Sequence, residues 1–334
     1  MKKIINFLLI FITTGLVLYF SLKDDYKVVI NTILNINKFW LFLGFLLVIL
    51  YWFTKSIVTV KIARKFKKTY SIKESLKMTL ETNFFHAITP FSSGGQPYEI
   101  YSLKKNGLRI TDATNVSMSC FIVYQIALVL LGIIAIIANY FGNFYPDNIV
   151  LKRLVTLGFI INFIVIVVLF LLTFTSKISK SLINFGINIL CKLKIVKNKE
   201  KTKDNFSKYL NDFHDGAKQL LTKKREFILL IGIQFLSLCC LYLIPYALIK
   251  GINLSINPFI VIITSAYVML IGSFVPIPGG TGGLEYGFVA FFSSFVGDVK
   301  LNAIMLLWRF ITYYFGMIIG SIILSVGKKE KRWE

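Results

Sequence analysis

Two short polar segments rich in glycine and proline interrupt an otherwise apolar sequence, and each ends in a glutamate. The first runs from Pro90 to Glu99 and reads PFSSGGQPYE, and the second runs from Pro276 to Glu285 and reads PIPGGTGGLE. The two look like copies of each other, with Pro90 matched to Pro276 and Glu99 matched to Glu285. Backbone that Gly and Pro break at membrane depth leaves N–H and C=O groups unpaired, so it persists only where protein or a watery cavity receives it. In transporters built from repeats, paired interruptions of this kind indicate the substrate site. We call these segments the first and the second break.

Glu99, Glu285 and Arg309 are the charged candidates for ligand binding. Each glutamate is expected in the first turn of the helix that follows its break, where the positive end of the helix dipole stabilises a carboxylate. N-terminal capping of that helix is the purely structural alternative. Arg309 lies inside the last apolar segment, where an unpaired guanidinium is costly. It should therefore meet either Glu285, as its internal partner, or an anionic group such as a lipid phosphate.

Uncharged residues complete the candidate site. The glycines of the breaks either permit tight turns and close packing or present backbone N–H groups to an anionic headgroup, and their pattern favours neither. With one glutamine from the next apolar segment, these candidates are Ser92, Ser93, Gly94, Gly95, Gln96, Gln125, Pro278, Gly279, Gly280, Thr281, Gly282 and Gly283.

Signals for catalysis or cofactor binding are weak. Neither break has the GxxxxGK[ST] spacing of a nucleotide-binding P-loop. His86 and His214 have no carboxylate at metal-ligand spacing, and the four cysteines show neither a zinc pattern nor a disulfide framework. We expect no catalytic residue, no metal and no cofactor.

The composition is that of a polytopic membrane protein. The chain has 334 residues, of which 56% are hydrophobic, a mean hydropathy of +0.70 and a formal net charge of +22. Its lysines and arginines lie in loops between apolar segments rather than on one folded domain, so they indicate cytoplasmic loops and exclude nucleic acid as a partner.

Six segments are long enough to cross a bilayer core, which needs roughly 20 apolar residues per helix: 4–22, 39–60, 113–139, 154–175, 227–249 and 301–326. The first is expected to be a retained signal anchor. Charge asymmetry predicts that both termini are cytoplasmic, in the cell membrane. We expect one integral membrane domain over residues 1–334, with a first half at 1–175 and a second half at 227–326. A basic cytoplasmic segment with an amphipathic helix fills residues 176–226, and a basic tail occupies 327–334.

The predicted orientation sends the two breaks into the membrane from opposite faces. Residues 78–109 are expected to enter from the cytoplasm and residues 258–297 from outside. Such opposed elements are what an inverted-topology repeat predicts. The fold class is therefore all-α, either with six full spans plus two re-entrant elements or with eight helices.

The second break and the later segment LWRFITYY, from Leu307 to Tyr314, carry a family resemblance. Together they resemble the flippase-like lysylphosphatidylglycerol synthase transmembrane-domain family, whose best known members are the multiple peptide resistance factors. The similarity covers roughly residues 5–326. The first break looks like the variant common in low-GC Gram-positive members. Most other members have Gly-Glu followed by Arg there, and often a Glu-Arg pair where this chain has Val123-Tyr124-Gln125.

The resemblance implies a role in moving or handling polar lipids. In two-part members a soluble aminoacyltransferase domain follows the membrane part, whereas this sequence ends at Glu334, soon after its last span. We therefore expect a stand-alone member that does not itself make aminoacyl lipids.

These observations predict a lipid translocase that passes a polar or anionic headgroup through a midplane cavity formed by the two breaks. A membrane-embedded lipid-modifying transferase, and a non-transporting assembly partner or ion pathway, are the alternatives. The expected partner is a membrane phospholipid or glycolipid. A second copy of the chain and a separate lipid-modifying enzyme are further candidates.

Overall fold

The computed structural model describes residues 26–144, 149–175, 181, 211, 214–216, 223–273 and 275–330. Within these ranges the fold is all-helical, as predicted, and no strand is present. The predicted span at 4–22 and nearly all of the predicted amphipathic helix in 176–226 lie outside the described residues.

Five helical stretches are long and apolar enough to cross a membrane, and they match the other five predicted spans. They are Lys38–Ala63 (α3), Ile110–Gly142 (α6), Ile149–Leu171 within α7 (Ile149–Phe174), Lys224–Gly251 and Lys300–Val326. The fourth contains α10 (Lys224–Tyr242) and α11 (Ile244–Gly251), which part where Pro245 removes a backbone donor. The fifth contains α14 (Asp298–Arg309), the π-helical segment η3 (Phe310–Tyr314) and α15 (Phe315–Glu330). A short helix, α2 (Tyr26–Asn35), packs on α14.

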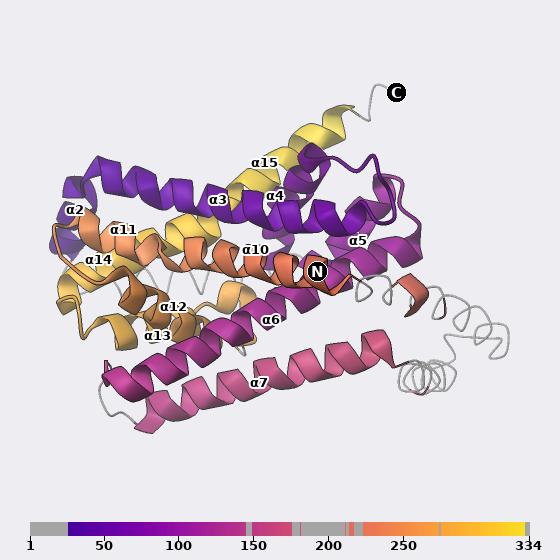
Figure 1. Ribbon diagram of the computed structural model, residues 1–334. Coiled ribbons are helices and arrows are strands. Elements are labelled where there is room, and N and C mark those ends of the chain that lie inside the picture. Colours follow the sequence, from indigo (N-terminus) through magenta and orange to yellow (C-terminus); the bar gives the residue numbers. More distant parts are fainter. Residues whose placement is uncertain are drawn as a thin grey trace, which may run out of the picture.

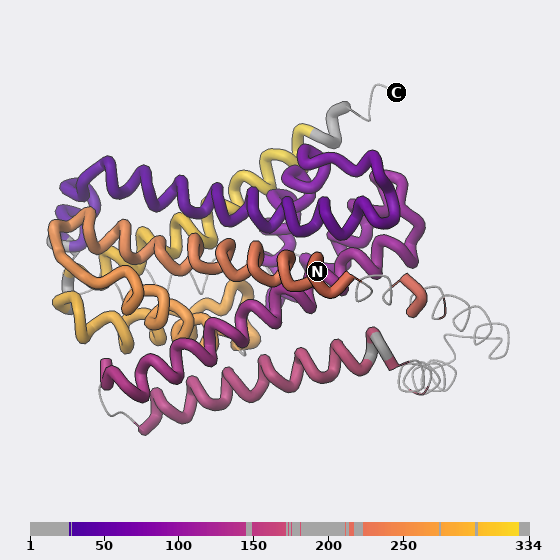
Figure 2. The backbone as a smooth tube through the Cα atoms, viewed as in Figure 1, coloured from indigo at the N-terminus to yellow at the C-terminus, as the bar shows by residue number. Residues whose placement is uncertain are grey.

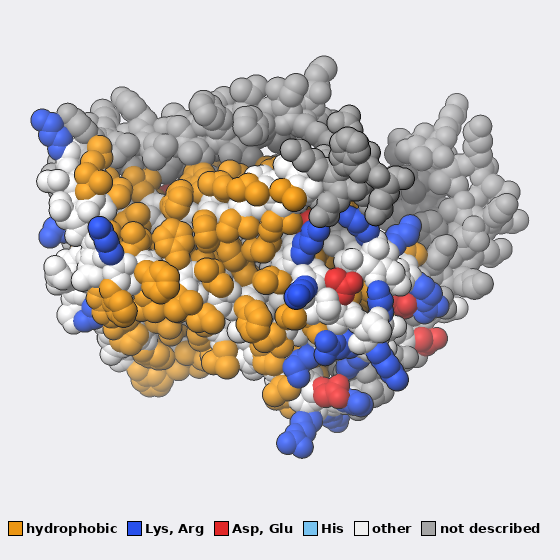
Figure 3. Space-filling model, turned by 90° about the horizontal axis from the view of Figure 1, so that it is seen from above, with side chains coloured by type: hydrophobic (Ala, Val, Ile, Leu, Met, Phe, Trp, Pro, Cys, Tyr) orange, Lys and Arg blue, Asp and Glu red, His pale blue; other side chains and the backbone are white. Residues whose placement is uncertain are grey.

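The long helices lie side by side. The helix α10 packs on α3 and α6, and α6 packs on α7 (Figures 1 and 2). Large apolar side chains are exposed along α3, α6 and α7, among them Phe42, Ile137 and Phe163. Figure 3 shows such side chains as a broad band that stops at an end rich in lysine and arginine. An apolar belt of this kind is what contact with lipid chains requires.

Loops that the sequence predicts to be cytoplasmic lie together at this basic end. Lys65 forms an ion pair with Glu226 at 3.2 Å, which joins the end of α3 to the start of α10. Lys67 Nζ donates to the Asn106 carbonyl oxygen at 2.6 Å, which joins two loops of the first half. The exposed basic residues at this end include Lys61, Arg64, Lys68, Lys73, Lys77, Lys104, Lys105, Arg109, Lys223, Lys224 and Arg225.

Each break forms the tip of a helical hairpin. The helices α4 (Ile72–Ala87) and α5 (Gly95–Lys105) pack against each other around the short turn η1 (Pro90–Ser92). The helices α12 (Pro258–Gly272) and α13 (Gly283–Phe292) do the same around η2 (Pro278–Gly280). Because α12 has 15 residues, it extends only about 22 Å, which is less than a bilayer core of about 30 Å.

The two hairpins meet at their tips. The turns η1 and η2 are in contact, while the base of the α4–α5 hairpin lies at the basic end and the base of the α12–α13 hairpin lies toward the other end (Figure 1). The hairpins therefore approach each other from opposite ends of the helix bundle.

The backbone matches the two breaks in a different register from the one predicted. Two residues with left-handed φ follow the first proline of each turn: Phe91 and Ser92 (φ 52° and 53°) after Pro90, and Gly279 and Gly280 (both φ 66°) after Pro278. The next helices begin at Gly95 and Gly283. Pro90 therefore corresponds to Pro278 and not to Pro276, so the predicted equivalence of Glu99 with Glu285 is wrong.

The shift changes where the glutamates lie. Glu285 is in the first turn of α13, as predicted. Glu99 is the fifth residue of α5, beyond its first turn, so its prediction is wrong. The reason is that α5 begins two residues before Pro97, and proline is tolerated in a first turn, where a backbone N–H has no intrahelical acceptor.

Candidate functional site

A cavity of about 470 Å³ lies where the hairpin tips meet. Its walls come from α3, α4, α5, α6, α7, α10, α12 and α13 together with both breaks. Phe91, Ser93 and Ser273 line it and are exposed, so it opens near the junction of the hairpins. Its volume falls within the range of roughly 300–1,000 Å³ that is usual for small-ligand sites.

The structure brings about half of the predicted site residues to this cavity. Those that line it are Ser92, Ser93, Gln96, Glu99, Gln125, Gly279 and Gly280. Those that do not are Gly94, Gly95, Pro278, Thr281, Gly282, Gly283, Glu285 and Arg309.

A lysine that the sequence reasoning missed faces the same cavity. Lys55, in the second half of α3, places Nζ 3.6 Å from Glu99 Oε1. The other carboxylate oxygen of Glu99 accepts a hydrogen bond from Ser117 Oγ at 3.0 Å. Both glutamate oxygens are thus engaged, while the side chain of Lys55 is the more accessible partner, at 20% exposed against 11%. A lone lysine within an apolar span was the signal that could have found it.

Local hydrogen bonds hold the first break in its unusual conformation. A ring nitrogen of His86, Nδ1, lies 2.6 Å from the carbonyl oxygen of Ser92, one of the two residues with left-handed φ. The His86 ring also explains why residue 95 is a glycine, because a Cβ atom there would lie 2.0 Å from His86 Cε1. Non-glycine residues in this backbone region store strain that surrounding contacts must hold.

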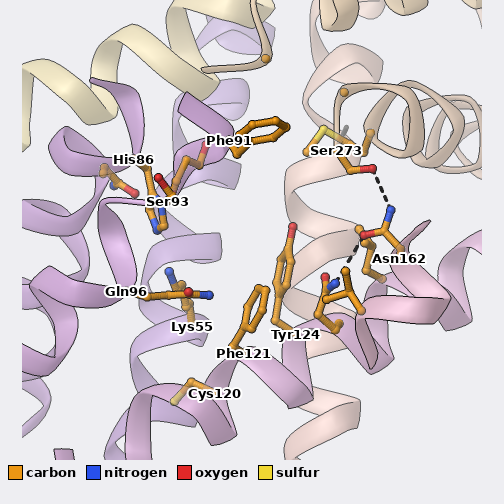
Figure 4. Close-up of a pocket in the computed structure, with 18 of the residues that line it drawn as sticks. Lys55, His86, Phe91, Ser93, Gln96, Cys120, Phe121, Tyr124, Asn162 and Ser273 are labelled. Carbon is orange, nitrogen blue, oxygen red and sulfur yellow. Dashed lines mark hydrogen bonds between the residues drawn. The ribbon is translucent and has the colours of Figure 1, made fainter. Parts of the chain in front are cut away.

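Carboxamide and aromatic side chains form much of the rest of the wall. Gln125 Nε2 donates to Asn162 Oδ1 at 3.4 Å, and Asn162 Nδ2 donates to Ser273 Oγ at 2.7 Å. These two hydrogen bonds link α6, α7 and α12. Figure 4 shows Asn162 and Ser273 across the cavity from His86, Ser93, Gln96 and Lys55. The carboxamides that line the cavity are Asn83, Gln96, Gln125, Asn162 and Gln234, and the aromatic residues are Tyr51, Phe91, Phe121 and Tyr124.

The predicted pair of Arg309 and Glu285 is present, but it lies behind the cavity wall. Arg309 Nε is 2.7 Å from Glu285 Oε1, and the two residues are only 3% and 6% exposed. Glu285 Oε2 accepts from the Gly282 N–H at 2.7 Å, so it also caps α13. Arg309 Nη2 donates to the Gly279 carbonyl oxygen at 3.1 Å and to Thr281 Oγ1 at 3.3 Å. The pair therefore fixes the backbone of the second break.

Tyr313 connects this network to the first hairpin. Its ring centroid lies 4.6 Å from Arg309 Cζ, and its hydroxyl donates to the Ala87 carbonyl oxygen at 3.0 Å. Tyr313 belongs to the π-helical segment η3, and such segments are frequent at functional sites. The last span thus holds both hairpin tips together.

Metal-ligand chemistry is not evident in this arrangement. Among the described residues, no group of three or more His, Cys, Asp and Glu side chains is placed to hold a metal ion. The cavity offers hydrogen bonds, aromatic faces and one lysine–glutamate pair.

Comparisons with known proteins identify a family and two relatives that match most of the chain. The profile of the lysylphosphatidylglycerol synthase TM region matches residues 4–320. A UPF0104 membrane protein from Archaeoglobus fulgidus is 24% identical over 304 residues, which cover 88% of each chain. An uncharacterized protein MG306 homolog from Mycoplasma pneumoniae is 23% identical over 344 residues, which cover 95% of this chain and 85% of the other.

Proposed function

The chain belongs to the lysylphosphatidylglycerol synthase TM region family, and on this premise we propose that it translocates lipids. A polar headgroup crosses through the cavity between the hairpin tips, while the acyl chains stay in the surrounding hydrocarbon. The observation that carries the proposal is the cavity itself, which has charged and carboxamide side chains in its wall and sits where two broken helical hairpins meet.

The geometry of the hairpins supports a re-entrant, inverted arrangement. Neither α12 nor α13, with 15 and 10 residues, is long enough to cross a bilayer core alone. The hairpins approach from opposite ends of the bundle and touch at their tips, as a midplane site in an inverted-repeat transporter requires. On the positive-inside rule, the basic end faces the cytoplasm, and α15, which continues into the basic tail, ends there (Figure 1).

Translocation fits the cavity better than catalysis. Enzymes that transfer groups to lipids need a nucleophile with a base, or a metal with its ligands. Here the carboxylate that lines the cavity, Glu99, is engaged by Lys55 and Ser117, and His86 contacts a backbone carbonyl. The proposal is therefore that this chain moves a lipid and does not modify it.

A blocking substitution tests the proposal. Ser93 lines the cavity and is exposed, so Ser93→Trp should fill the cavity without disturbing the packed core. The assay measures scrambling of tail-labelled anionic, aminoacylated and glycosylated lipids in proteoliposomes. We expect scrambling by the unmodified protein and a loss of at least tenfold in the variant.

Ser293→Trp is the matched control, because Ser293 is also exposed but lies at the end of α13, outside the cavity lining. It should scramble like the unmodified protein. Equal scrambling by both tryptophan variants would show that lipids do not pass through this cavity, and turnover of a lipid into a new product would favour the transferase.

A further inference from the structure

The chemistry of the cavity wall specifies more than a polar headgroup. Five carboxamides line a single cavity of about 470 Å³. Each carboxamide offers both an acceptor oxygen and a donor NH₂ group, which is the set that pairs with hydroxyl groups. Aromatic rings from Tyr51, Phe91, Phe121 and Tyr124 line the same cavity and supply apolar faces. Together they suit a ligand with several hydroxyl groups on a carbon skeleton.

The charges at the cavity suit an anionic link rather than a cationic headgroup. Among the described residues that line it, Glu99 is the one acid, and both of its oxygens are engaged by Lys55 and Ser117. An ammonium-bearing headgroup would have to compete with these partners for the carboxylate. Lys55, in contrast, has three N–H donors and the more accessible side chain of the pair, so it can receive a phosphate oxygen.

Two of the amides carry a buried donor group that finds no partner within the described structure. They are Asn83 Nδ2 and Gln234 Nε2, and Gln234 as a whole is 2% exposed. A buried donor without an acceptor destabilises the folded state, because it has lost its hydration without gaining a hydrogen bond. Both atoms are enclosed by protein, so a ligand oxygen can become their acceptor only once the side-chain amide turns toward the cavity that both residues line.

From the carboxamides, aromatic rings and lysine that line the cavity, we infer that the transported headgroup is an uncharged polyol attached through a phosphodiester. This inference rests on the proposed translocation and names its substrate class. The phosphate lies at Lys55, and the hydroxyl groups pair with the amides. A cationic aminoacylated lipid and a choline lipid are poor substrates. Glycerol and ring-shaped headgroups share this chemistry, so both belong in the test.

The experiment compares headgroups at a fixed acyl chain. Proteoliposomes of phosphatidylcholine contain traces of one tail-labelled lipid: phosphatidylglycerol, phosphatidylinositol, lysylphosphatidylglycerol or phosphatidylcholine. We expect scrambling of phosphatidylglycerol, phosphatidylinositol or both to be at least tenfold faster than that of the other two lipids. Whichever of these two lipids is scrambled faster shows whether the preferred headgroup is glycerol or inositol. Equal rates for all four, or a faster lysylated or choline lipid, would overturn the polyol inference while leaving translocation intact. No scrambling of any lipid would overturn translocation and the inference with it.

A substitution separates ligand contact from structural support. Gln234→Met keeps the length of the side chain but removes the unpartnered donor, so the folded state should be at least as stable as before. Its preference for polyol lipids should fall at least threefold. The matched control is Asn115→Ala, because Asn115 is also a buried amide whose side chain has no partner in the described structure, yet it lies outside the cavity. That variant should keep the full preference. An unchanged preference in Gln234→Met would contradict the inference.

Discussion

Removing the buried ion pair behind the second break should cost stability in a way that a thermodynamic cycle can resolve. Arg309 and Glu285 are 3% and 6% exposed and lie 2.7 Å apart. Removing one partner of a buried pair leaves an uncompensated charge and costs about 3–5 kcal/mol. Glu285→Gln is therefore expected to lower the free energy of unfolding by about 3 kcal/mol, at the lower end, because Arg309 keeps its contacts with Gly279 and Thr281.

The arginine substitution should cost more than the glutamate substitution. Arg309→Met also removes two hydrogen bonds donated by a charged group, to the Gly279 carbonyl oxygen and to Thr281 Oγ1. We expect a loss of about 4–5 kcal/mol, at the upper end of the range for a broken buried pair. In the double variant no unpaired charge is left, so its loss should stay close to that of Arg309→Met alone rather than reach the sum.

Reversible denaturation in mixed micelles, followed by tryptophan fluorescence, measures these losses. A loss of about 3 kcal/mol changes the folded-to-unfolded ratio by roughly a hundredfold, well within reach of the method. Lys223→Gln is the comparison, because Lys223 pairs with Glu226 while both side chains are exposed, at 69% and 46%, and exposed pairs contribute little. Strictly additive losses for Arg309→Met and Glu285→Gln, or losses as small as that of Lys223→Gln, would refute the assigned role of the buried pair.

Two smaller changes test how the first hairpin is held. Gly95→Ala should reduce stability and scrambling together, because its Cβ would lie 2.0 Å from the His86 ring, whereas Gly297→Ala, which meets nothing within 4 Å, should do neither in the same denaturation and scrambling assays. Tyr313→Phe should cost about 1 kcal/mol in the denaturation assay, since it removes one hydrogen bond to the Ala87 carbonyl oxygen. A Tyr313→Phe protein with unchanged stability would show that this bond does not hold the hairpin tips together.

Apolar patterning and breaker residues were enough to predict the five spans that lie within the described residues, and the two hairpins. Spans depend on summed hydrophobicity over about 20 residues, so a few wrong boundaries do not change them. The breaks depend on Gly and Pro, whose effects on the backbone are local. The Arg309–Glu285 pair could be predicted because a lone arginine in an apolar span needs a nearby acid.

The alignment of the two breaks with each other could not be predicted by matching identical residue types. Both segments have a proline nine residues before a glutamate, yet the backbone equates Pro90 with Pro278, because the position of the left-handed residues decides where each turn closes. In the first break Phe91 and Ser92 adopt left-handed φ without being glycine, so residue type gave no signal there. Side-chain contacts from the preceding helix, such as that of His86 with Ser92, decide such conformations.

The cavity wall was the least predictable part of the site, since its residues come from eight helices and each contributes only one or a few side chains. Lys55 is one charge in an apolar helix, and Asn162 is one buried amide in another. Neither alters the mean hydropathy of its span enough to stand out. Only the packing of α3, α6 and α7 shows that such isolated polar residues face the same space.

The two glutamates, which look equivalent in sequence, have partners of different kinds, and this difference separates the tasks of the two halves. Glu285 is enclosed by an arginine and a backbone N–H that hold the turn η2, away from the cavity. Glu99 lines the cavity and holds a lysine whose ammonium stays partly accessible. If the proposed function is right, the second hairpin supplies a rigid backbone wall made of Gly279 and Gly280. The first hairpin supplies the carboxylate of Glu99, which holds Lys55 at the cavity. Neutralising Lys55 together with Glu99 should then slow transport with little loss of stability, the opposite of what removing Arg309 should do.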